Sequence, residues 1–380
     1  MIAVSRADTG YLARWWWTVD RPVAFASLAL MGLGLILVAT AGPAAAARIS
    51  SVADASHFIV RHAVFLAPAA VVLTATALAP ASWVRRAALA AFLGSLALIV
   101  LALMVGPEIK GAHRWIDLGP FMLQPSEFLK PGLVVACAWV LSERLRDPEA
   151  PGRVLAIAAY LVSAGLLIKQ PDYGQFLLTT AAWGATFFVA GLNWAWIAAL
   201  STFAVSALAG AYLAVPHVAH RIDAFMNPET ADTFQVDRSI ETIMRGGLFG
   251  AGPGEGVAKQ GLPDAHTDFI FAVLAEEYGL VACAGLVVLY AFIALRAFSA
   301  AARRGSVFQQ SAVAGLATLI GAQAFINIGV ALRVLPAKGM TLPFLSYGGS
   351  SLIATAFTLG LILALGRDHG PARRRAEELV

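Results

Sequence analysis

The feature that most restricts the fold of this chain is a series of long apolar runs separated by short polar segments. Several runs are about 18–23 residues long, which is enough for an α-helix to cross the roughly 30 Å hydrocarbon core of a bilayer. Hydrophobic residues make up 59% of the 380 residues and charged residues only 13%, whereas a water-soluble fold needs a more polar surface. We therefore expect an all-α, polytopic integral membrane helix bundle.

Run length and hydropathy predict about ten transmembrane helices. They cover 22–43, 60–80, 86–106, 126–143, 154–170, 174–191, 194–214, 279–298, 308–333 and 349–366. We interpret the first as a retained signal-anchor helix, because it is long and the chain soon re-enters the membrane. The arginine-rich segments fall on the side that holds both termini, so the positive-inside rule places both termini in the cytoplasm. The chain is then one membrane domain, 1–380, with a large outer loop at 214–268.

Charge and cysteine usage restrict the partners. Cys137 and Cys283 lie inside apolar runs, so neither a disulfide framework nor a cysteine metal cluster is expected. The net charge of +4 comes mostly from loop arginines and indicates contact with membrane lipids rather than nucleic acid. Basic residues on the predicted outer side oppose the topological bias and indicate an anionic ligand there.

The first polar motif is the outer segment 110–130, which runs into an apolar helix. Pro125 suits a first helical turn, which Ser126 or Glu127 would cap or favour electrostatically. Glu127 and Lys130 are three residues apart and share a helical face. One interpretation is a capped helix with an interfacial ion pair. The other is a cationic seat for a phosphate group, formed by Arg114 and Lys130 and oriented by Glu127 and Gln124.

The second motif is the turn 169–175, where a proline and a glycine interrupt two apolar spans. Asp172 either caps the helix that follows or balances Lys130 or Arg114 inside a polar cavity. The residues alone leave both roles open.

The third motif delivers Asp268 to the point where a glycine-rich segment meets apolar sequence. Thr267 or Asp268 would gain roughly 0.3–1 kcal/mol by capping a helix here. A carboxylate at a membrane boundary is equally a candidate for chemistry. His266 is expected to orient its neighbours through hydrogen bonds, because no second histidine has metal-ligand spacing.

Glu276 and Glu277 follow two turns after Asp268, inside apolar sequence. Since 279–296 already suffices to span a bilayer, we expect 268–278 to form a short helix buried in protein. Three carboxylates in one apolar region repel one another unless they are paired or protonated.

The fourth motif, 337–351, joins the last two spans. Its glycines allow helices to approach closely and its hydroxyls suit helix caps. We interpret it as a packing segment, with Lys338 as a possible functional residue.

Four stretches carry a resemblance to a known family: GAHRWIDLGPFMLQPSEFLK, KQPDYGQ, LPDAHTDFIFAVLAEEYG and LPAKGMTLPFLSYGGSS. In this order they closely resemble the signature regions of the SEDS (shape, elongation, division and sporulation) family. The residues of the last two stretches are more similar to those of the division members of this family than to those of its elongation members. Gln175 departs from the pattern, since the family commonly has threonine there.

The resemblance implies a ten-helix peptidoglycan glycosyltransferase that polymerises lipid II, the undecaprenyl-pyrophosphate-linked disaccharide-pentapeptide. It implies work on the outer face of the bacterial cytoplasmic membrane, with Asp268 as general base. It also implies that Arg114, Glu127, Lys130 and Asp172 are sensitive cavity residues. A class B penicillin-binding transpeptidase and other divisome proteins are the implied partners.

On this interpretation Arg114 and Lys130 neutralise the departing pyrophosphate, with Lys338 or Arg221 in reserve, and one base with direct displacement inverts the anomeric carbon. No metal site is identified from the residues. A divalent cation, Mg²⁺ or Mn²⁺, is nevertheless conceivable because of Asp172, Glu276 and Glu277. The alternatives are a lipid II flippase, which fits intramembrane charges, and a non-catalytic scaffold of the division complex.

Overall fold

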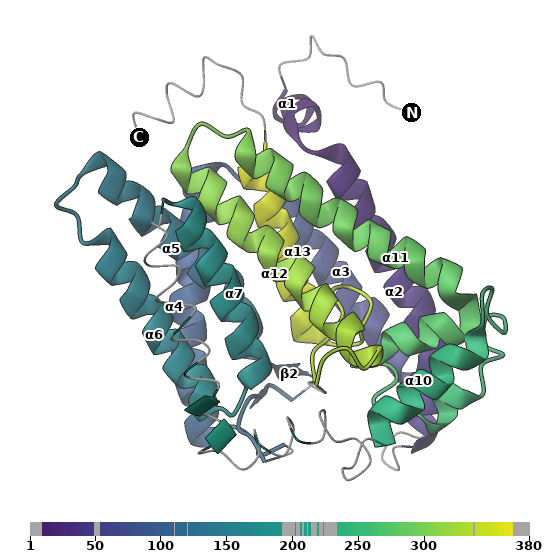
Figure 1. Cartoon of the computed structure of the whole chain (residues 1–380). Coiled ribbons are helices and arrows are strands. Elements are labelled where there is room, and N and C mark those ends of the chain that lie inside the picture. Colours follow the sequence, from purple (N-terminus) through teal and green to yellow (C-terminus); the bar gives the residue numbers. More distant parts are fainter. Residues whose placement is uncertain are drawn as a thin grey trace.

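The computed structural model describes residues 10–48, 54–109, 111–119, 121–191, 234–336 and 339–367, with isolated positions between 202 and 223. Two residues predicted to bind substrate, Arg221 and Lys338, lie outside the described residues, as does most of the predicted span 194–214. The described part is a bundle of long helices with a small polar cap of turns at one end (Figure 1).

The helices of the first half are α1 (Tyr11–Thr18), α2 (Arg21–Arg48), α3 (His57–Leu78), α4 (Ala81–Val105), α5 (Pro125–Arg146), α6 (Gly152–Lys169) and α7 (Tyr173–Val189). The second half has α10 (Phe234–Gly246), the 3₁₀-helix η2 (Ala258–Gly261), α11 (Ile270–Ala302), α12 (Val307–Ala331) and α13 (Gly349–Leu365). Strands β1 (Ile116–Asp117) and β2 (Met122–Leu123) form an antiparallel hairpin before α5.

The predicted membrane helix bundle is confirmed. Six described helices are long and apolar enough to cross a bilayer, namely α2, α3, α4, α6, α11 and α12. The predicted spans 126–143, 174–191 and 349–366 correspond to α5, α7 and α13. The predicted total of ten is not established, because the span at 194–214 falls mostly outside the described residues.

Buried helices at the centre of the bundle position the polar cap. Helix α13 packs against α3 and α12, and nearly all of its residues are buried. Helix α5 contacts α4, α6, α7 and α12 (Figure 1) and buries Leu129, Leu133 and Val134. Polar groups at the first turns of α5 and α13 are therefore held by core packing.

One end of the bundle gathers arginines, as predicted from the loop charges. Arg296 donates to both carboxylate oxygens of Asp20 at 2.8 and 2.9 Å. The guanidinium of Arg304 donates to the carbonyl of Arg367 at 2.5 Å, and Arg367 donates to the carbonyl of Ala79. The first pair of bonds joins the residue before α2 to α11, and the others join the α11–α12 turn to the end of α13 and the end of α13 to the α3–α4 turn. The hairpin, α10 and the turns before α11 lie at the opposite end (Figure 1).

Helix α11 is divided at Gly279, which has φ 77° and ψ 178°. The first part, 270–278, is almost wholly buried, and the part after Gly279 continues to Ala302. The predicted short buried helix before a full span is therefore present. A Cβ at Gly279 would lie 2.3 Å from the carbonyl oxygen of Leu248, so both conformation and close approach require glycine here.

The Gly279→Ala variant should be less stable than the wild type by about 1–3 kcal/mol from the backbone conformation alone. Thermal or denaturant unfolding in detergent measures the change. Gly285→Ala is the matched control, because it lies in the same helix and a Cβ there meets nothing within 4 Å. Equal unfolding of the two variants would show that the break does not depend on glycine.

Candidate active site

Helix α5 begins directly after the hairpin, at the polar end of the bundle. Pro125 occupies its first turn, as predicted, and Gln124 is the N-cap residue. Ser126 does not cap the helix, whereas Glu127 lies in the first turn, where its charge favours the positive helix end as predicted. Ser126 lies one position inside the helix, and its buried Oγ has no hydrogen-bond partner in the described part of the chain. The Gln124 backbone N–H instead donates to the Ser350 hydroxyl at 3.0 Å, which joins the starts of α5 and α13.

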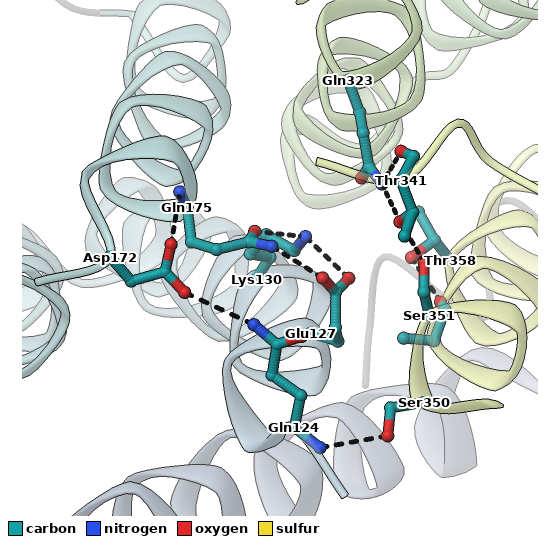
Figure 2. Close-up of polar contacts among 11 residues, drawn as sticks. Gln124, Glu127, Lys130, Asp172, Gln175, Gln323, Thr341, Ser350, Ser351 and Thr358 are labelled. Carbon is teal, nitrogen blue, oxygen red and sulfur yellow. Dashed lines mark hydrogen bonds and ion pairs between the residues drawn. The ribbon is translucent and has the colours of Figure 1, made fainter. Parts of the chain in front are cut away.

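Lys130 lies in a buried cluster with Glu127 and Gln175 (Figure 2). Its ammonium donates to Glu127 Oε2 at 2.9 Å and to Gln175 Oε1 at 2.6 Å. The Gln175 amide donates in turn to Glu127 Oε1 at 2.6 Å. Lys130 and Glu127 side chains are only 3% and 5% exposed. The predicted ion pair is therefore present, and it is buried rather than interfacial.

The Lys130 ammonium makes two hydrogen bonds inside the cluster. A lysine ammonium has three N–H donors, and Glu127 and Gln175 take two of them. The Lys130 charge is balanced by the Glu127 carboxylate, and the cationic seat for a phosphate group stays a prediction. An anion bound here would be held by an ammonium whose position is already fixed.

Arg114 and Asp172 connect the hairpin to the α6–α7 turn. Arg114 Nε donates to the carbonyl of Gln170 at 3.1 Å, and its Nη2 donates to the carbonyl of Pro171. Asp172 caps α7 by accepting the Gln175 N–H at 3.4 Å, and it accepts the Gln124 amide at 3.3 Å. Asp172 thus has the predicted capping role, and it also lies inside the polar cluster.

Burial raises the pKa of the Asp172 carboxyl, and the Arg114 guanidinium and the Gln175 N–H offset this shift only in part. Asp172 consequently holds its proton to higher pH than an exposed aspartate. Asp172 and Arg114 are close enough for electrostatic interaction, so the turn and the hairpin form one charged unit.

Asp268 lies in the turn that precedes α11. The predicted capping of this helix by Thr267 or Asp268 is wrong: the N-cap is Phe269, without a side-chain cap bond in the described residues. Thr267 Oγ1 donates to the carbonyl of Asp264 at 3.2 Å, so it stabilises the turn. The carboxylate of Asp268 packs over Gly339, with Oδ2 3.1 Å from the point where a Cβ of that glycine would lie.

The turn is held by the segment between α12 and α13. The backbone N–H of Tyr347 donates to the carbonyl of His266 at 2.8 Å, and the Ser346 hydroxyl donates to the carbonyl of Thr267. The His266 ring is buried against Phe58, with ring centroids 4.2 Å apart. Its predicted role in orienting neighbours stays a prediction.

Glu276 and Glu277 bond to the loop that precedes Asp268. Glu276 accepts the backbone N–H groups of Ala258 at 2.6 Å and Lys259 at 2.9 Å. Glu277 forms a buried ion pair with the Lys259 ammonium. The expectation that these carboxylates need partners is met inside the chain. Lys259, an outer basic residue expected to attract an anionic ligand, is neutralised by Glu277.

The Lys259→Met variant should lose about 3–5 kcal/mol of stability, because it leaves the Glu277 carboxylate buried without its cation. Unfolding of the purified protein in detergent measures the loss. The double variant Lys259→Met, Glu277→Gln should recover most of it, since no unpaired charge remains. A double variant as unstable as the single one would contradict a charge-pairing role.

The divalent cation stays a prediction. No group of three or more His, Cys, Asp or Glu side chains able to hold a metal occurs among the described residues. Glu276 and Glu277 are bound to η2, whereas Asp172 bonds to α5 and α7. These three carboxylates therefore do not form the ligand set that the sequence suggested, and no step below is assigned to a metal.

Hydrogen bonds connect all four sequence motifs at this end of the bundle. Arg114, Gln124 and Lys130 of the first motif bond to the second. Gln124 also bonds to Ser350 of the fourth, and Ser346 of the fourth bonds to Thr267 of the third. Segments up to 228 residues apart in the chain, such as Met122 and Ser350, are thus in direct contact.

Sequence reasoning missed several residues of this arrangement. The sequence assigns no role to Gln175, yet its amide links Lys130 to Glu127. Asn327 is a buried amide in α12 that bonds to the Asp268 and Met340 carbonyls, and Gln323, one turn earlier, is a second buried amide that bonds to Thr341 outside this arrangement. Their spacing of four residues within an apolar span is a signal that sequence reading could have used.

The polar site lies at one end of a membrane helix bundle. It is built from α5, α7, the turn before α11 and the start of α13. The chain is therefore a membrane-embedded protein with a polar site at the membrane boundary. The family model described as "Cell cycle protein" (FtsW, RodA and SpoVE) matches residues 21–369, so the chain belongs to the FtsW/RodA/SpoVE family.

Curated and solved relatives agree with this family. The chain is 44% identical, over 97% of its length and 94% of the relative's, to the "Probable peptidoglycan glycosyltransferase FtsW" of Caulobacter vibrioides. It is 31% identical to the crystal structure of Thermus thermophilus RodA, with a TM-score of 0.68 over 92% of this chain and 97% of that one. A chain from a study of polymerization and crosslinking by a peptidoglycan synthase complex matches with a TM-score of 0.76 at 31% identity, over 92% of this chain and 98% of that chain.

Proposed function

We propose that this chain is a peptidoglycan glycosyltransferase that polymerises lipid II into glycan strands at the outer face of the bacterial cytoplasmic membrane during septal wall synthesis. The family and the names of its relatives support the reaction class. One observation carries the proposal for the site. Four polar motifs meet at the end of the bundle opposite the arginine-rich end, with Asp268 in a turn rather than in a helix cap.

The reaction joins two lipid-linked sugars. The 4-hydroxyl oxygen of the acceptor GlcNAc attacks C1 of the donor sugar, and the bond from C1 to the pyrophosphate oxygen breaks. The hydroxyl proton passes to the Asp268 carboxylate, and polyprenyl pyrophosphate leaves with the bonding electron pair. Asp268 acts as general base by accepting the proton as attack proceeds. A single displacement inverts the configuration at C1.

Lys130 and Arg114 supply positive charge for the leaving group. The buried Lys130 ammonium is fixed by Glu127 and Gln175 and has a third donor for a phosphate oxygen. Fixed charges of this kind stabilise developing negative charge without reorganising during the reaction. Glu127 pairs with Lys130, and Asp172, which accepts the Gln124 amide, interacts electrostatically with Arg114. Lys338 and Arg221 lie outside the described residues, and we propose them as further cations that could neutralise the pyrophosphate.

The site also suits a lipid substrate. A polyprenyl tail remains in the bilayer while its head group reaches the polar end of the bundle, where the hairpin and the turn before α11 lie (Figure 1). A class B penicillin-binding transpeptidase is the proposed partner, supported by the likeness to a chain of a peptidoglycan synthase complex. Other divisome proteins are further proposed partners.

Purified protein, alone and with its transpeptidase partner, should convert lipid II into glycan strands that are resolved by gel electrophoresis. Parallel reactions with Mg²⁺, with Mn²⁺ and with a chelator test the predicted divalent cation. Transbilayer movement of lipid II in vesicles tests the flippase alternative. Lipid II movement without polymerisation would replace this proposal with transport, and neither activity would favour a scaffold.

A further inference from the structure

Asn327 is a buried amide in a membrane-spanning helix, and it has no assigned part in the proposed glycosyl transfer. It belongs to α12 and is 2% exposed. An amide at this depth is costly unless its hydrogen-bonding groups are satisfied. Its Nδ2 group is hydrogen-bonded, whereas its buried Oδ1 has no hydrogen-bond partner among the described residues.

Both N–H donors of Asn327 bond to carbonyls outside regular helices. One donates to the carbonyl oxygen of Asp268 at 2.8 Å, and the other donates to that of Met340 at 2.6 Å. A single side chain thus ties the turn before α11 to the segment before α13. The bond to Asp268 is made to the residue proposed as general base.

The two bonds of Asn327 hold the backbone of Asp268 and that of Met340. The carbonyl bond sets the orientation of the peptide plane after Asp268, and so helps to set the direction of its side chain. Met340 is the neighbour of Gly339, over which the carboxylate packs. Asn327 therefore fixes the backbone of Asp268 and the surface against which its carboxylate lies.

Two further bonds extend the same pattern along the turn. The carbonyls of His266, Thr267 and Asp268 accept, in order, from Tyr347 N, Ser346 Oγ and Asn327 Nδ2. Three consecutive peptide groups are thus held from one side. Asn327 alone supplies its bond from a transmembrane helix, and not from the neighbouring loop.

Gln323 provides a natural comparison one helical turn earlier. Its amide donates to the Thr341 carbonyl at 2.9 Å and lies 3.4 Å from the Thr341 hydroxyl, which is bonded to Ser351 (Figure 2). It is 5% exposed, so the two amides are similarly buried. Among the described residues, the hydrogen bonds of Gln323 go to the segment before α13, whereas Asn327 bonds both to that segment and to the turn that carries Asp268.

We propose that Asn327 is a positioning residue for the glycosyl transfer: it clamps the Asp268 backbone to Met340 and thereby aims the carboxylate at the acceptor hydroxyl. This inference rests on the proposed function and assigns Asn327 a part in it. A misplacement of about 1 Å at a reacting group can cost roughly 100-fold in rate, so the clamp governs turnover more than substrate binding.

The test compares Asn327→Leu and Gln323→Leu in lipid II polymerisation by the purified protein with its partner. Asn327→Leu should lower kcat about 10- to 100-fold and leave KM for lipid II within about twofold. Gln323→Leu should stay within about threefold of the wild type in both constants, because the Asp268 carbonyl keeps its bond. Thermal unfolding of both variants shows whether each remains folded.

Gly339→Ala is a second route to the same result. Its methyl would lie 3.1 Å from Asp268 Oδ2, so the carboxylate must move by a few tenths of an ångström while the Asn327 bonds to the backbone carbonyls of Asp268 and Met340 remain. It should lower kcat at unchanged KM, by less than Asn327→Leu does. Equal kinetics for Asn327→Leu and Gln323→Leu, or a normal kcat in Gly339→Ala, would overturn the positioning role. An inactive wild type would instead refute the proposed function.

Discussion

Replacing Asp268 with asparagine should lower lipid II polymerisation by about 10²- to 10⁴-fold, which is the usual contribution of a general base. Asparagine has nearly the same shape, so the turn keeps the Asn327 and Ser346 bonds to its backbone. What is lost is the ability to take the proton from the acceptor hydroxyl. Initial rates with purified protein and partner measure the effect, and Asp268→Ala should be at least as slow.

Asp117→Asn is the matched control for this substitution. Asp117 lies in β1 at the same end of the bundle, is exposed, and accepts the Gly119 N–H through Oδ1, a bond that asparagine can retain. Its variant should keep activity within about threefold of the wild type, because an exposed carboxylate there contributes little. Full activity in Asp268→Asn would remove the assigned base.

Replacing Lys130 with methionine should have two separate effects. Turnover should fall about 10²- to 10³-fold, because the leaving pyrophosphate loses a fixed cation. Stability should fall by about 3–5 kcal/mol, because Glu127 is left buried beside Gln175 without its ion-pair partner. Polymerisation rates and denaturant unfolding in detergent measure the two quantities.

The double variant Lys130→Met, Glu127→Gln separates the two effects. It contains no unpaired buried charge, so its stability should return towards that of the wild type. Its activity should stay low, because the ammonium is still absent. If activity recovered together with stability, Lys130 would be a structural residue and not part of the pyrophosphate site.

The membrane fold was predictable because bilayer thickness imposes helix length directly on the sequence. The division of α11 was predictable for the same reason: 279–296 suffices to cross the membrane, so 270–278 had to be buried elsewhere. Residues near one another in sequence were also well placed. Glu127 and Lys130 share a helical face, and Asp172 caps the helix that follows it.

Long-range pairings were not predictable from the residues. Glu276 and Glu277 suggested a metal because nothing in the sequence places η2 and Lys259 beside them. Asp268 suggested a cap because its segment reads as a helix start, whereas the structure begins the helix two residues later. Gln175 seemed incidental because its contacts with Glu127 lie 48 residues away in the chain.

The fourth motif shows the same limit. It was interpreted as a packing segment, and Ser346, Ser350 and Thr341 do hold loops and helix starts together. Its bonds to the His266–Asp268 turn appear only once α12 and α13 are brought together. The segment that the sequence indicates as a packing element therefore also positions the turn that carries Asp268.

A structure of the Asp268→Asn variant bound to its partner and to lipid II tests the central claim most directly. The acceptor 4-hydroxyl oxygen should lie about 2.6–3.2 Å from the side chain at position 268, the distance required for proton transfer. The donor pyrophosphate should contact Lys130 and Arg114. Lipid II bound at the arginine-rich end, or with its pyrophosphate away from both cations, would contradict the account.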